Sequence, residues 1–359
     1  MHYDFAVFIG RFQPLHNGHQ HIIDQALRSA KKLIILIGSA DTARSIRNPF
    51  TLDERIRFIA ASYQREISAG RIVISGISDR LYNDNAWIAE VQRLVTDTVL
   101  DFGNAESPHS TLHGTNDFKI GLAGYKKDGT SFYLKMFPDW GAIDIASQYG
   151  TFNSTDIRND YFRRAPMLPR DICSDGVVQF LKDFRLTPEF AALVEEREFV
   201  DQYKASWASA PYPPVFVTAD AVTIQSGHVL LVRRGQQPGK GQLAIPGGYV
   251  NQNERIRAAA VRELKEETAI KDGKGEIPPA MLESFIDDTA TRVFDAPHRS
   301  VRGRIITHAF LFRCPDRRSL FTVKGGDDAH SAAWYRLGDL SPEQFFEDHF
   351  SILEEMIGI

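Results

Sequence analysis

The sequence predicts a two-domain α/β protein whose first domain is built on a doubly wound parallel sheet. The chain has 359 residues, and single hydrophobic cores rarely grow beyond about 250–300 residues. Short apolar segments alternate with helical patterns through the first half, which is typical of a parallel sheet covered by helices. A proline-rich run at 211–214 cannot lie inside a helix and separates the two halves. We therefore expect domains over residues 1–165 and 213–359, joined by a helical and proline-rich linker over 166–212.

The first half contains five expected strands, each a short apolar run, and four expected helices with apolar residues three and four positions apart. The strands are expected at residues 5–9, 33–37, 71–77, 119–125 and 142–146. The helices are expected at residues 18–29, 51–61, 86–100 and 154–164. Thr51 and Glu54 have the spacing of a capping box, which opens the second of these helices.

The second half begins with a predicted β-hairpin and contains one strong helix. The hairpin strands cover 215–224 and 229–233, and the helix covers 254–268. Further strands are expected at residues 282–286, 305–312 and 334–335, before a final helix. Between the halves, residues 177–184 and 190–203 have amphipathic helical spacing.

The composition excludes several classes of protein. The net charge of −4 is mild and no basic block is dense, so nucleic acid is not an expected partner. The two cysteines, Cys173 and Cys314, are far apart, so neither a disulfide framework nor a zinc site is expected. The N-terminus lacks the features of a signal peptide, and no apolar run reaches the ~20 residues of a membrane span. We therefore expect a cytoplasmic protein without a membrane partner.

A segment rich in glycine and histidine leaves the first strand and opens the following helix. It covers residues 10–19 and reads GRFQPLHNGH. A loop at this position lies at the carboxyl edge of the sheet, where ligands bind, and the helix amides favour an anion. His16 and His19 can both face that anion, while Gly10 and Gly18 allow close approach to the backbone. The segment therefore predicts a binding site for a nucleotide phosphate.

This segment resembles the first motif of the nucleotidylyltransferase superfamily, whose core is His-x-Gly-His. The second motif of that superfamily is Ser-Thr-x-x-Arg at the start of a late helix, and residues 152–158 resemble it as FNSTDIR. We expect the Ser154 and Thr155 hydroxyls to cap this helix. The helix amides and Arg158 are expected to bind the distal phosphates.

Two further segments are similar to archaeal-type nicotinamide mononucleotide adenylyltransferases. They are RNPFT at 47–51, continued by Glu54 and Arg55, and NAW at 85–87. The resemblance implies that Arg47 and Trp87 bind the mononucleotide, since a pyridinium ring is attracted to an indole face. An aromatic on an amphipathic helix also packs into cores, and a loop arginine is often solvated, so both alternatives stay open.

The implied reaction transfers the adenylyl group of ATP to nicotinamide mononucleotide and gives NAD and pyrophosphate. By this resemblance the site residues are His16, His19, Ser154, Thr155, Arg158, Gly10, Arg11 and Phe12. The histidines would contact the ATP phosphates, Arg158 would bind pyrophosphate, and Mg²⁺ would bridge phosphates. The stretch 124–138 resembles the bifunctional members of the family, which carry a His where Tyr125 stands.

Three glutamates of the predicted helix at 254–268 project from one helical face. Glu263, Glu266 and Glu267 stand at positions i, i+3 and i+4. Three carboxylates this close repel one another unless a cation lies among them, and hard divalent cations prefer oxygen ligands. The pattern therefore predicts a Mg²⁺ or Mn²⁺ site that polarises a pyrophosphate and activates water.

Residues 248–270 resemble the Nudix box, which implies an α/β/α Nudix sandwich for the second domain. The resemblance makes the three glutamates metal ligands, and makes Glu263 the residue that orients or deprotonates water. Glu254 and Arg262 are expected to form a supporting ion pair. One departure is Ala269, which stands where the family has Gly and predicts a different helix exit or local strain.

A basic segment at 294–304 resembles a stretch shared by bifunctional adenylyltransferase–Nudix proteins and by Nudix-derived regulators of NAD metabolism. Its Arg299 and Arg302 are expected to hold a substrate phosphate, with a solvated basic loop as the alternative. ADP-ribose is the preferred substrate, cleaved to AMP and ribose 5-phosphate. This preference follows from the pairing of the domains, because ADP-ribose arises from NAD breakdown.

Alternatives stay open for both domains. In the alternative for the first domain, it adenylylates another phosphate ester. In the alternatives for the second domain, it acts on another nucleoside diphosphate derivative, or it is a non-catalytic sensor of ADP-ribose or NAD. The presence of all three glutamates favours catalysis. The expected partners are small molecules, namely ATP, nicotinamide mononucleotide and ADP-ribose. The sequence does not decide the oligomeric state, and a homo-oligomer stays open.

Overall fold

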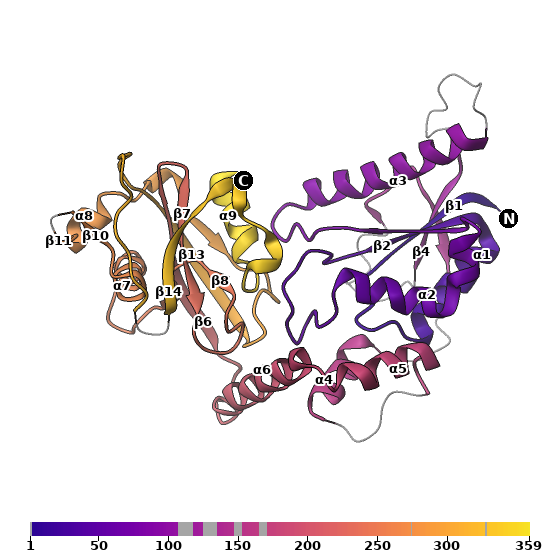
Figure 1. Ribbon diagram of the computed structural model, residues 1–359, viewed down its shortest axis with the longest axis horizontal. Helices are drawn as coiled ribbons and strands as arrows, with labels where there is room; N and C mark the ends of the chain where they lie inside the picture. Colours follow the sequence, from indigo (N-terminus) through magenta and orange to yellow (C-terminus); the bar gives the residue numbers. More distant parts are fainter. Residues whose placement is uncertain are drawn as a thin grey trace. The chain divides into compact units, whose positions relative to one another are not determined.

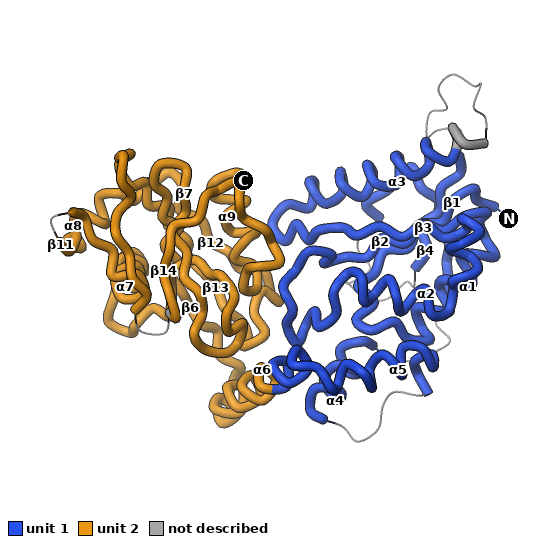
Figure 2. Tube along the Cα trace, viewed as in Figure 1, with its two compact units in different colours: residues 1–194 blue, residues 195–359 orange. Residues whose placement is uncertain are grey.

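The computed structural model describes residues 2–106, 118–124, 135–146, 153–164, 171–273, 275–326 and 329–359. It divides into two compact units, Met1–Val194 and Glu195–Ile359 (Figure 2). The division falls inside the segment predicted to link two domains. Each unit has its own sheet and its own hydrophobic core.

Unit 1 is built on a five-stranded sheet in which every neighbouring pair is parallel. Its strands are β1 (Tyr3–Gly10), β2 (Ala30–Ile37), β3 (Ile72–Gly76), β4 (Ile120–Gly124) and β5 (Gly141–Asp144). Their order is β3-β2-β1-β4-β5, so the chain builds the sheet outward from β1 first on one side and then on the other. The doubly wound prediction is confirmed. The carboxyl ends of β1 and β4 flank the crevice in which such sheets bind ligands.

The helices of unit 1 follow the predicted pattern, with longer ends. They are α1 (Asn17–Ser29), α2 (Leu52–Ser68), α3 (Asp84–Glu106), α4 (Ser154–Phe162), α5 (Asp175–Phe184) and α6 (Pro188–Ala205), the last of which continues into unit 2. The capping box of α2 is confirmed, because Thr51 Oγ1 accepts from the Glu54 amide and Glu54 Oε2 accepts from the Thr51 amide. These two bonds satisfy amides that the first helical turn leaves without partners.

Aromatic side chains attach the helices after α4 to unit 1. Phe180 of α5 packs edge-on against Phe58 of α2, with ring centroids 4.8 Å apart. Phe190 at the start of α6 lies 5.1 Å from Tyr161 of α4. Residues 171–194 therefore bury their apolar faces in the same unit as the parallel sheet.

Unit 2 contains a mixed sheet between two helices. Its strands are β6 (Val215–Gln225), β7 (His228–Arg234), β8 (Leu243–Ala244), β9 (Gly247–Tyr249), β12 (Arg292–Phe294), β13 (Arg304–Arg313) and β14 (Ala329–Arg336). Helices α7 (Ile256–Thr268) and α9 (His349–Ile357) lie on opposite sides of this sheet (Figure 1). Ala219 and Ala221 of β6 pack on Leu264 of α7 in the buried core. The predicted α/β/α sandwich is confirmed.

The strand expected at 282–286 is wrong, because a short helix, α8 (Pro279–Glu283), ends within that stretch and a turn at Ser284 and Phe285 follows it. Pro279 stands at the start of the helix, where its fixed φ and missing N–H favour a first turn. Leu282 is fully buried from this helix, and Ile286 makes only an isolated bridge to Phe312. The small elements β10 (Lys271–Asp272), β11 (Gly275–Glu276), η3 (Asp288–Ala290), η4 (Leu337–Asp339) and η5 (Pro342–Gln344) complete the unit.

Helix α7 ends as the family pattern does, although Ala replaces Gly. Ala269 has φ 41° and ψ 40°, a left-handed conformation that is strained for a residue with a Cβ atom. Its amide donates to the Lys265 carbonyl and closes the last turn. The sequence predicts either a different helix exit or local strain at Ala269. The structure has the strain, and the helix ends with the usual left-handed residue. Within the described parts of the chain, no helix is both long and apolar enough to cross a membrane.

Candidate functional site

The histidines of the first motif lie at the start of α1 and hold each other in place. His16 is the N-cap, and its Nδ1 accepts from the Gly18 amide at 3.1 Å. His19 Nδ1 accepts from the His16 amide at 3.4 Å, and the two rings stack with centroids 3.8 Å apart. Since each Nδ1 is an acceptor, the proton of each neutral ring is on Nε2, which can donate to a phosphate oxygen.

The second motif, on α4, is bonded to the loop of the first. Arg158 donates from one terminal nitrogen to the Gln13 carbonyl at 2.7 Å and from the other to Thr155 Oγ1 at 3.1 Å. The Ser154 hydroxyl donates to the Pro14 carbonyl at 3.3 Å. The structure therefore brings together the two predicted phosphate motifs, which lie far apart in the sequence.

The N-cap of α4 differs from the prediction. Asn153 caps the helix, because its Oδ1 accepts from the Asp156 amide at 3.0 Å. The hydroxyls of Ser154 and Thr155 do not cap it. Asn153 lies one residue before the helix, where a short polar side chain in extended backbone reaches the free amides. Ser154 and Thr155 are already helical, which turns their hydroxyls to Pro14 and Arg158 instead.

Three arginines give this crevice a positive charge. Burial, and then the nearby charges of Arg11 and Arg47, lower the pKa of Arg158 to about 9. Desolvation and the charge of Arg47 likewise lower the pKa of Arg11. Guanidinium groups that destabilise one another in this way are typical of a site that binds an anion of high charge.

A fully buried arginine, which the sequence did not single out as a site residue, supports the loops around this charge. Arg55 of α2 donates to the carbonyls of Arg11 at 3.1 Å, Gly38 at 2.6 Å and Ser39 at 2.9 Å. Burial lowers the pKa of Arg55 to about 10. Two sequence signals point to Arg55: its segment resembles the archaeal-type adenylyltransferases, and an arginine there interrupts the apolar face of α2, next to Phe58.

The remaining predicted residues of the first site lie in the hydrophobic core or at its edge. Phe12 is 1% exposed and its ring centroid lies 5.0 Å from that of His19, so its side chain supports the histidine from the core. A Cβ on Gly10 would lie 3.1 Å from the Phe12 ring, which explains the glycine. Trp87 is half-buried against Phe137, 6.2 Å between centroids, at the edge of the core. Tyr125 lies outside the described residues.

In unit 2, Arg262 holds the acidic face of α7 together. Its guanidinium makes two bonds to Glu254, at 2.6 and 3.0 Å, so the predicted ion pair is confirmed. It also bonds Glu263 at 2.7 Å and Glu266 at 2.9 Å. The hydrogen bonds to Glu254, and then those to Glu266 and Glu263, raise the pKa of Arg262. One cation therefore bridges three carboxylates, which shows how much positive charge this face accommodates.

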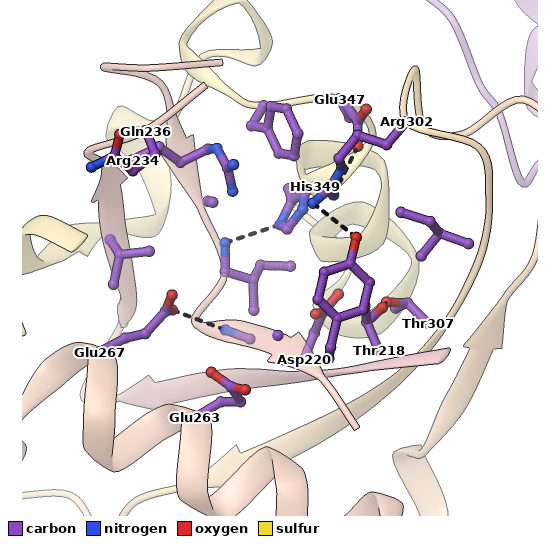
Figure 3. A pocket seen from close by; sticks show the side chains of 18 of the residues that line it. Thr218, Asp220, Arg234, Gln236, Glu263, Glu267, Arg302, Thr307, Glu347 and His349 are labelled. Carbon is purple, nitrogen blue, oxygen red and sulfur yellow. Dashed lines mark hydrogen bonds and ion pairs between the residues drawn. The ribbon is translucent and has the colours of Figure 1, made fainter. Parts of the chain in front are cut away.

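Two of the three predicted metal ligands point from α7 into a pocket (Figure 3). Glu267 Oε2 accepts from the Gly247 amide at 3.0 Å, and burial followed by Glu263 raises the pKa of Glu267 to about 8. Burial also raises the pKa of Glu263. A Cβ on Gly248 would lie 2.5 Å from the Glu263 carboxylate, so this strand leaves space for the acid. Glu266 is exposed and does not line the pocket.

The acidic side chains of α7 are oxygen donors of the kind that a divalent cation prefers. Among the described residues, no group of three His, Cys, Asp or Glu side chains is positioned to hold an ion. The raised pKa values of Glu263 and Glu267 show that added positive charge is favourable here. Oxygen ligands of this type fit Mg²⁺ or Mn²⁺.

The pocket has a volume of about 560 Å³ and is built from the sheet, α6, α7 and the start of α9. Both predicted arginines line it, and each forms an ion pair with a carboxylate. Arg299 makes two buried bonds to Asp348, at 2.8 and 2.9 Å. Arg302 lies 3.8 Å from Glu347 and 3.4 Å from the Tyr249 hydroxyl.

Several lining residues were not predicted as site residues. They include Asp220, Arg234 and His349, and the aromatic residues Phe199, Tyr203 and Tyr249. The sequence does contain one signal, since Asp220 is the only charged residue in strand β6. The aromatic side chains of α6 carry no such signal, because aromatic residues on an amphipathic helix usually serve only to pack its apolar face.

Comparisons with known proteins agree with this two-site arrangement. A cytidylyltransferase-like family model matches residues 7–106, and a NUDIX domain model matches residues 215–356. The chain is 36% identical over 183 residues to a nicotinamide/nicotinic acid mononucleotide adenylyltransferase of Acinetobacter baylyi, covering 51% of this chain and 87% of the relative. It is 32% identical over 139 residues to an ADP-ribose pyrophosphatase of Methanocaldococcus jannaschii, covering 39% and 71%.

A solved structure resembles the whole chain. The crystal structure of a bifunctional NMN adenylyltransferase/ADP ribose pyrophosphatase from Francisella tularensis has a TM-score of 0.85 and 34% identity, and the match covers 98% of this chain and 97% of that one. A second structure of the Francisella tularensis protein, complexed with AMP and an MN ion, has a TM-score of 0.84 at 34% identity. The chain therefore belongs to the family of bifunctional NMN adenylyltransferase/ADP ribose pyrophosphatases.

Proposed function

We propose that this chain makes NAD and pyrophosphate from ATP and nicotinamide mononucleotide, and hydrolyses ADP-ribose to AMP and ribose 5-phosphate. Family membership over nearly the whole chain supports both reactions. The observation that carries the first is the pair of bonds from α4 to the loop after β1, which places Arg158 beside the histidine motif. The observation that carries the second is the pocket into which Glu263 and Glu267 point.

In the transferase reaction, the residues of unit 1 position phosphates and offset their charge. An oxygen of the mononucleotide 5′-phosphate attacks the α-phosphorus of ATP, and the bond from that phosphorus to the pyrophosphate oxygen breaks. The Nε2–H groups of His16 and His19 donate to the phosphates. Arg158 neutralises the leaving pyrophosphate, while Arg11 and Arg47 add charge nearby. Such positioning supplies most of the catalysis in phosphoryl transfer.

In the hydrolase reaction, α7 supplies the acidic groups. Glu263, Glu266 and Glu267 would hold Mg²⁺ or Mn²⁺, which polarises the diphosphate and lowers the pKa of bound water when present. Glu263, oriented by Arg262, is placed to take the proton of the attacking water. Water adds to one phosphorus, the bridging P–O–P bond breaks, and the two phosphate monoesters leave.

A substrate panel on the full chain tests both activities in one preparation. NAD formation is measured with ATP and nicotinamide mononucleotide, and AMP release is measured with ADP-ribose and other nucleoside diphosphate derivatives, each with Mg²⁺ and with Mn²⁺. We expect NAD from the first mixture and fastest AMP release from ADP-ribose. Tight binding of ADP-ribose without AMP release under either metal would instead establish the sensor alternative. The cytoplasmic location and the absence of nucleic-acid partners stay predictions.

A further inference from the structure

A buried carboxylate on β6 has no hydrogen-bond partner for one of its oxygens. Asp220 is 4% exposed, and within the described structure its Oδ2 atom lacks a partner. An unsatisfied buried oxygen destabilises the folded protein, and a charged one does so more strongly. Burial raises the pKa of Asp220 to about 7, which reflects this cost. A group of this kind calls for an explanation in function, because most buried polar atoms are satisfied.

The Asp220 side chain faces the pocket. Its neighbours along the strand, Ala219 and Ala221, pack on α7, so alternation along β6 directs Asp220 to the other face of the sheet. Figure 3 shows Asp220 there with Thr218 and Thr307 in the same pocket as the glutamates of α7.

The backbone around Asp220 makes room for it. Gly247 of β9 is the register partner of Asp220, and a Cβ at that position would collide with Asp220 Oδ1. The same Gly247 donates its amide to Glu267. Gly247 therefore lies between the Asp220 carboxylate and Glu267 of the predicted metal-binding face. A ligand bound at Glu267 can extend to Asp220.

A donor lies in the same pocket. His349, at the start of α9, is buried, and its Nδ1 accepts from the Ile245 amide at 3.1 Å. Burial, and then the charges of nearby arginines, hold the pKa of His349 well below its usual value. The ring is therefore neutral with its proton on Nε2. An acceptor and a donor together match a hydroxyl group, which both donates and accepts.

The aromatic residues of the pocket are more exposed than this polar floor. Tyr249 is 37% exposed and Phe199 is 36% exposed, whereas Asp220 and His349 are buried. The Tyr249 hydroxyl is 2.9 Å from that of Tyr203 on α6. Exposed aromatic faces suit a nucleobase, and a buried pair of polar groups suits a sugar.

We propose that Asp220 and His349 form a subsite for a hydroxyl of the terminal ribose of ADP-ribose, and that Asp220 is a binding residue for that half of the substrate. The ribose hydroxyl donates to Asp220 Oδ2 and accepts from His349 Nε2. The subsite rests on the proposed ADP-ribose hydrolysis and deepens it, because it makes the pocket selective for diphosphates that carry a sugar on the second phosphate.

The test compares the full-length wild-type chain with Asp220→Asn, which keeps the size of the side chain and removes its charge. KM and kcat for ADP-ribose are measured, together with the inhibition constants of AMP and of ribose 5-phosphate. We expect KM and the ribose 5-phosphate constant to rise about 10- to 100-fold, because a hydrogen bond to a charged group is lost. The AMP constant and kcat should change less than about threefold. Asp287→Asn, which removes a carboxylate outside the pocket, is the matched control and should change none of these.

Each other outcome overturns the subsite. Weakening of AMP alone would place Asp220 in the adenosine half, and equal weakening of both inhibitors would show an effect that is not specific to the terminal ribose. A higher Mn²⁺ requirement with unchanged ribose 5-phosphate inhibition would make Asp220 a metal ligand. Unchanged values throughout would leave it without a role in binding. No AMP release by the wild type would refute the proposed function itself. A melting temperature at or above that of the wild type verifies folding of Asp220→Asn, and His349→Gln provides a second variant with the same expected selectivity.

Discussion

At the scale of the residue, function depends on groups whose orientation is fixed by bonds to the local backbone. Arg158 is an example, because its two terminal nitrogens bond the Gln13 carbonyl and Thr155 at once. The planar guanidinium can span both partners, whereas the single ammonium of lysine cannot. The geometry thus requires arginine where charge alone would allow lysine.

Arg158→Lys should therefore lower kcat/KM for ATP in NAD formation by about 10- to 100-fold, because positive charge is kept but the orientation is lost. Steady-state kinetics of NAD formation measure the effect. Arg163→Lys, at the exposed end of α4, is the matched control and should behave as the wild type. Wild-type kinetics in Arg158→Lys would show that orientation of this group is unimportant.

The two cysteines should be inert in the folded chain. Cys173 is 4% exposed and Cys314 is 7% exposed, and burial raises the pKa of each thiol to about 12. An acid whose pKa is raised stays protonated, so only about one part in ten thousand is thiolate at pH 8. A colorimetric thiol reagent should detect no fast-reacting group in the native protein and two after denaturation. One fast-reacting native thiol would contradict this burial.

At the scale of the element, the structure shows where periodicity is a sufficient guide and where it is not. The apolar run near Leu282 has the composition of a strand, yet Pro279 opens a helix there. Short apolar runs do not separate helix from strand, so flanking proline decides. The end of α7 shows the opposite case, because the family pattern predicts the backbone correctly even where Ala269 is strained.

Ala269→Gly should relieve that strain and stabilise unit 2 by about 0.5–1 kcal/mol, since Gly adopts a positive φ without a Cβ penalty. The effect is measured as a higher midpoint of thermal or urea unfolding. Ala258→Gly, at an exposed position inside the same helix, should instead destabilise by a similar amount. If both substitutions destabilise equally, the left-handed exit is not strained.

At the scale of the whole molecule, each reaction has a site made from one unit. The residues of the transferase site lie within Met1–Val194, and those of the hydrolase pocket lie within Glu195–Ile359. Topology and motif order were predictable from the sequence, because alternating strands and helices leave few arrangements of the chain. Asp220 and His349 were not, because they come together only when β6 and α9 pack into one sandwich.

Variants should therefore separate the two activities. His19→Ala should lower NAD formation by about 100-fold or more while AMP release is kept, because a phosphate donor is lost. Glu263→Gln should lower AMP release by about 100-fold or more while NAD formation is kept. Parallel assays of the two products on each variant measure this. Loss of both activities in either variant would show that the sites depend on each other.

The helix that crosses the division between the units has a practical consequence for dissecting the protein. The first turn of α6 packs against α4 of unit 1 through Phe190 and Tyr161, but Phe199 and Tyr203 further along it belong to the wall of the hydrolase pocket. The NUDIX family match begins only at residue 215. A hydrolase excised at that boundary would keep every acidic residue named here and still lack part of its binding surface. Weak substrate affinity in such a fragment would result from the truncation and would not be a property of the full-length enzyme.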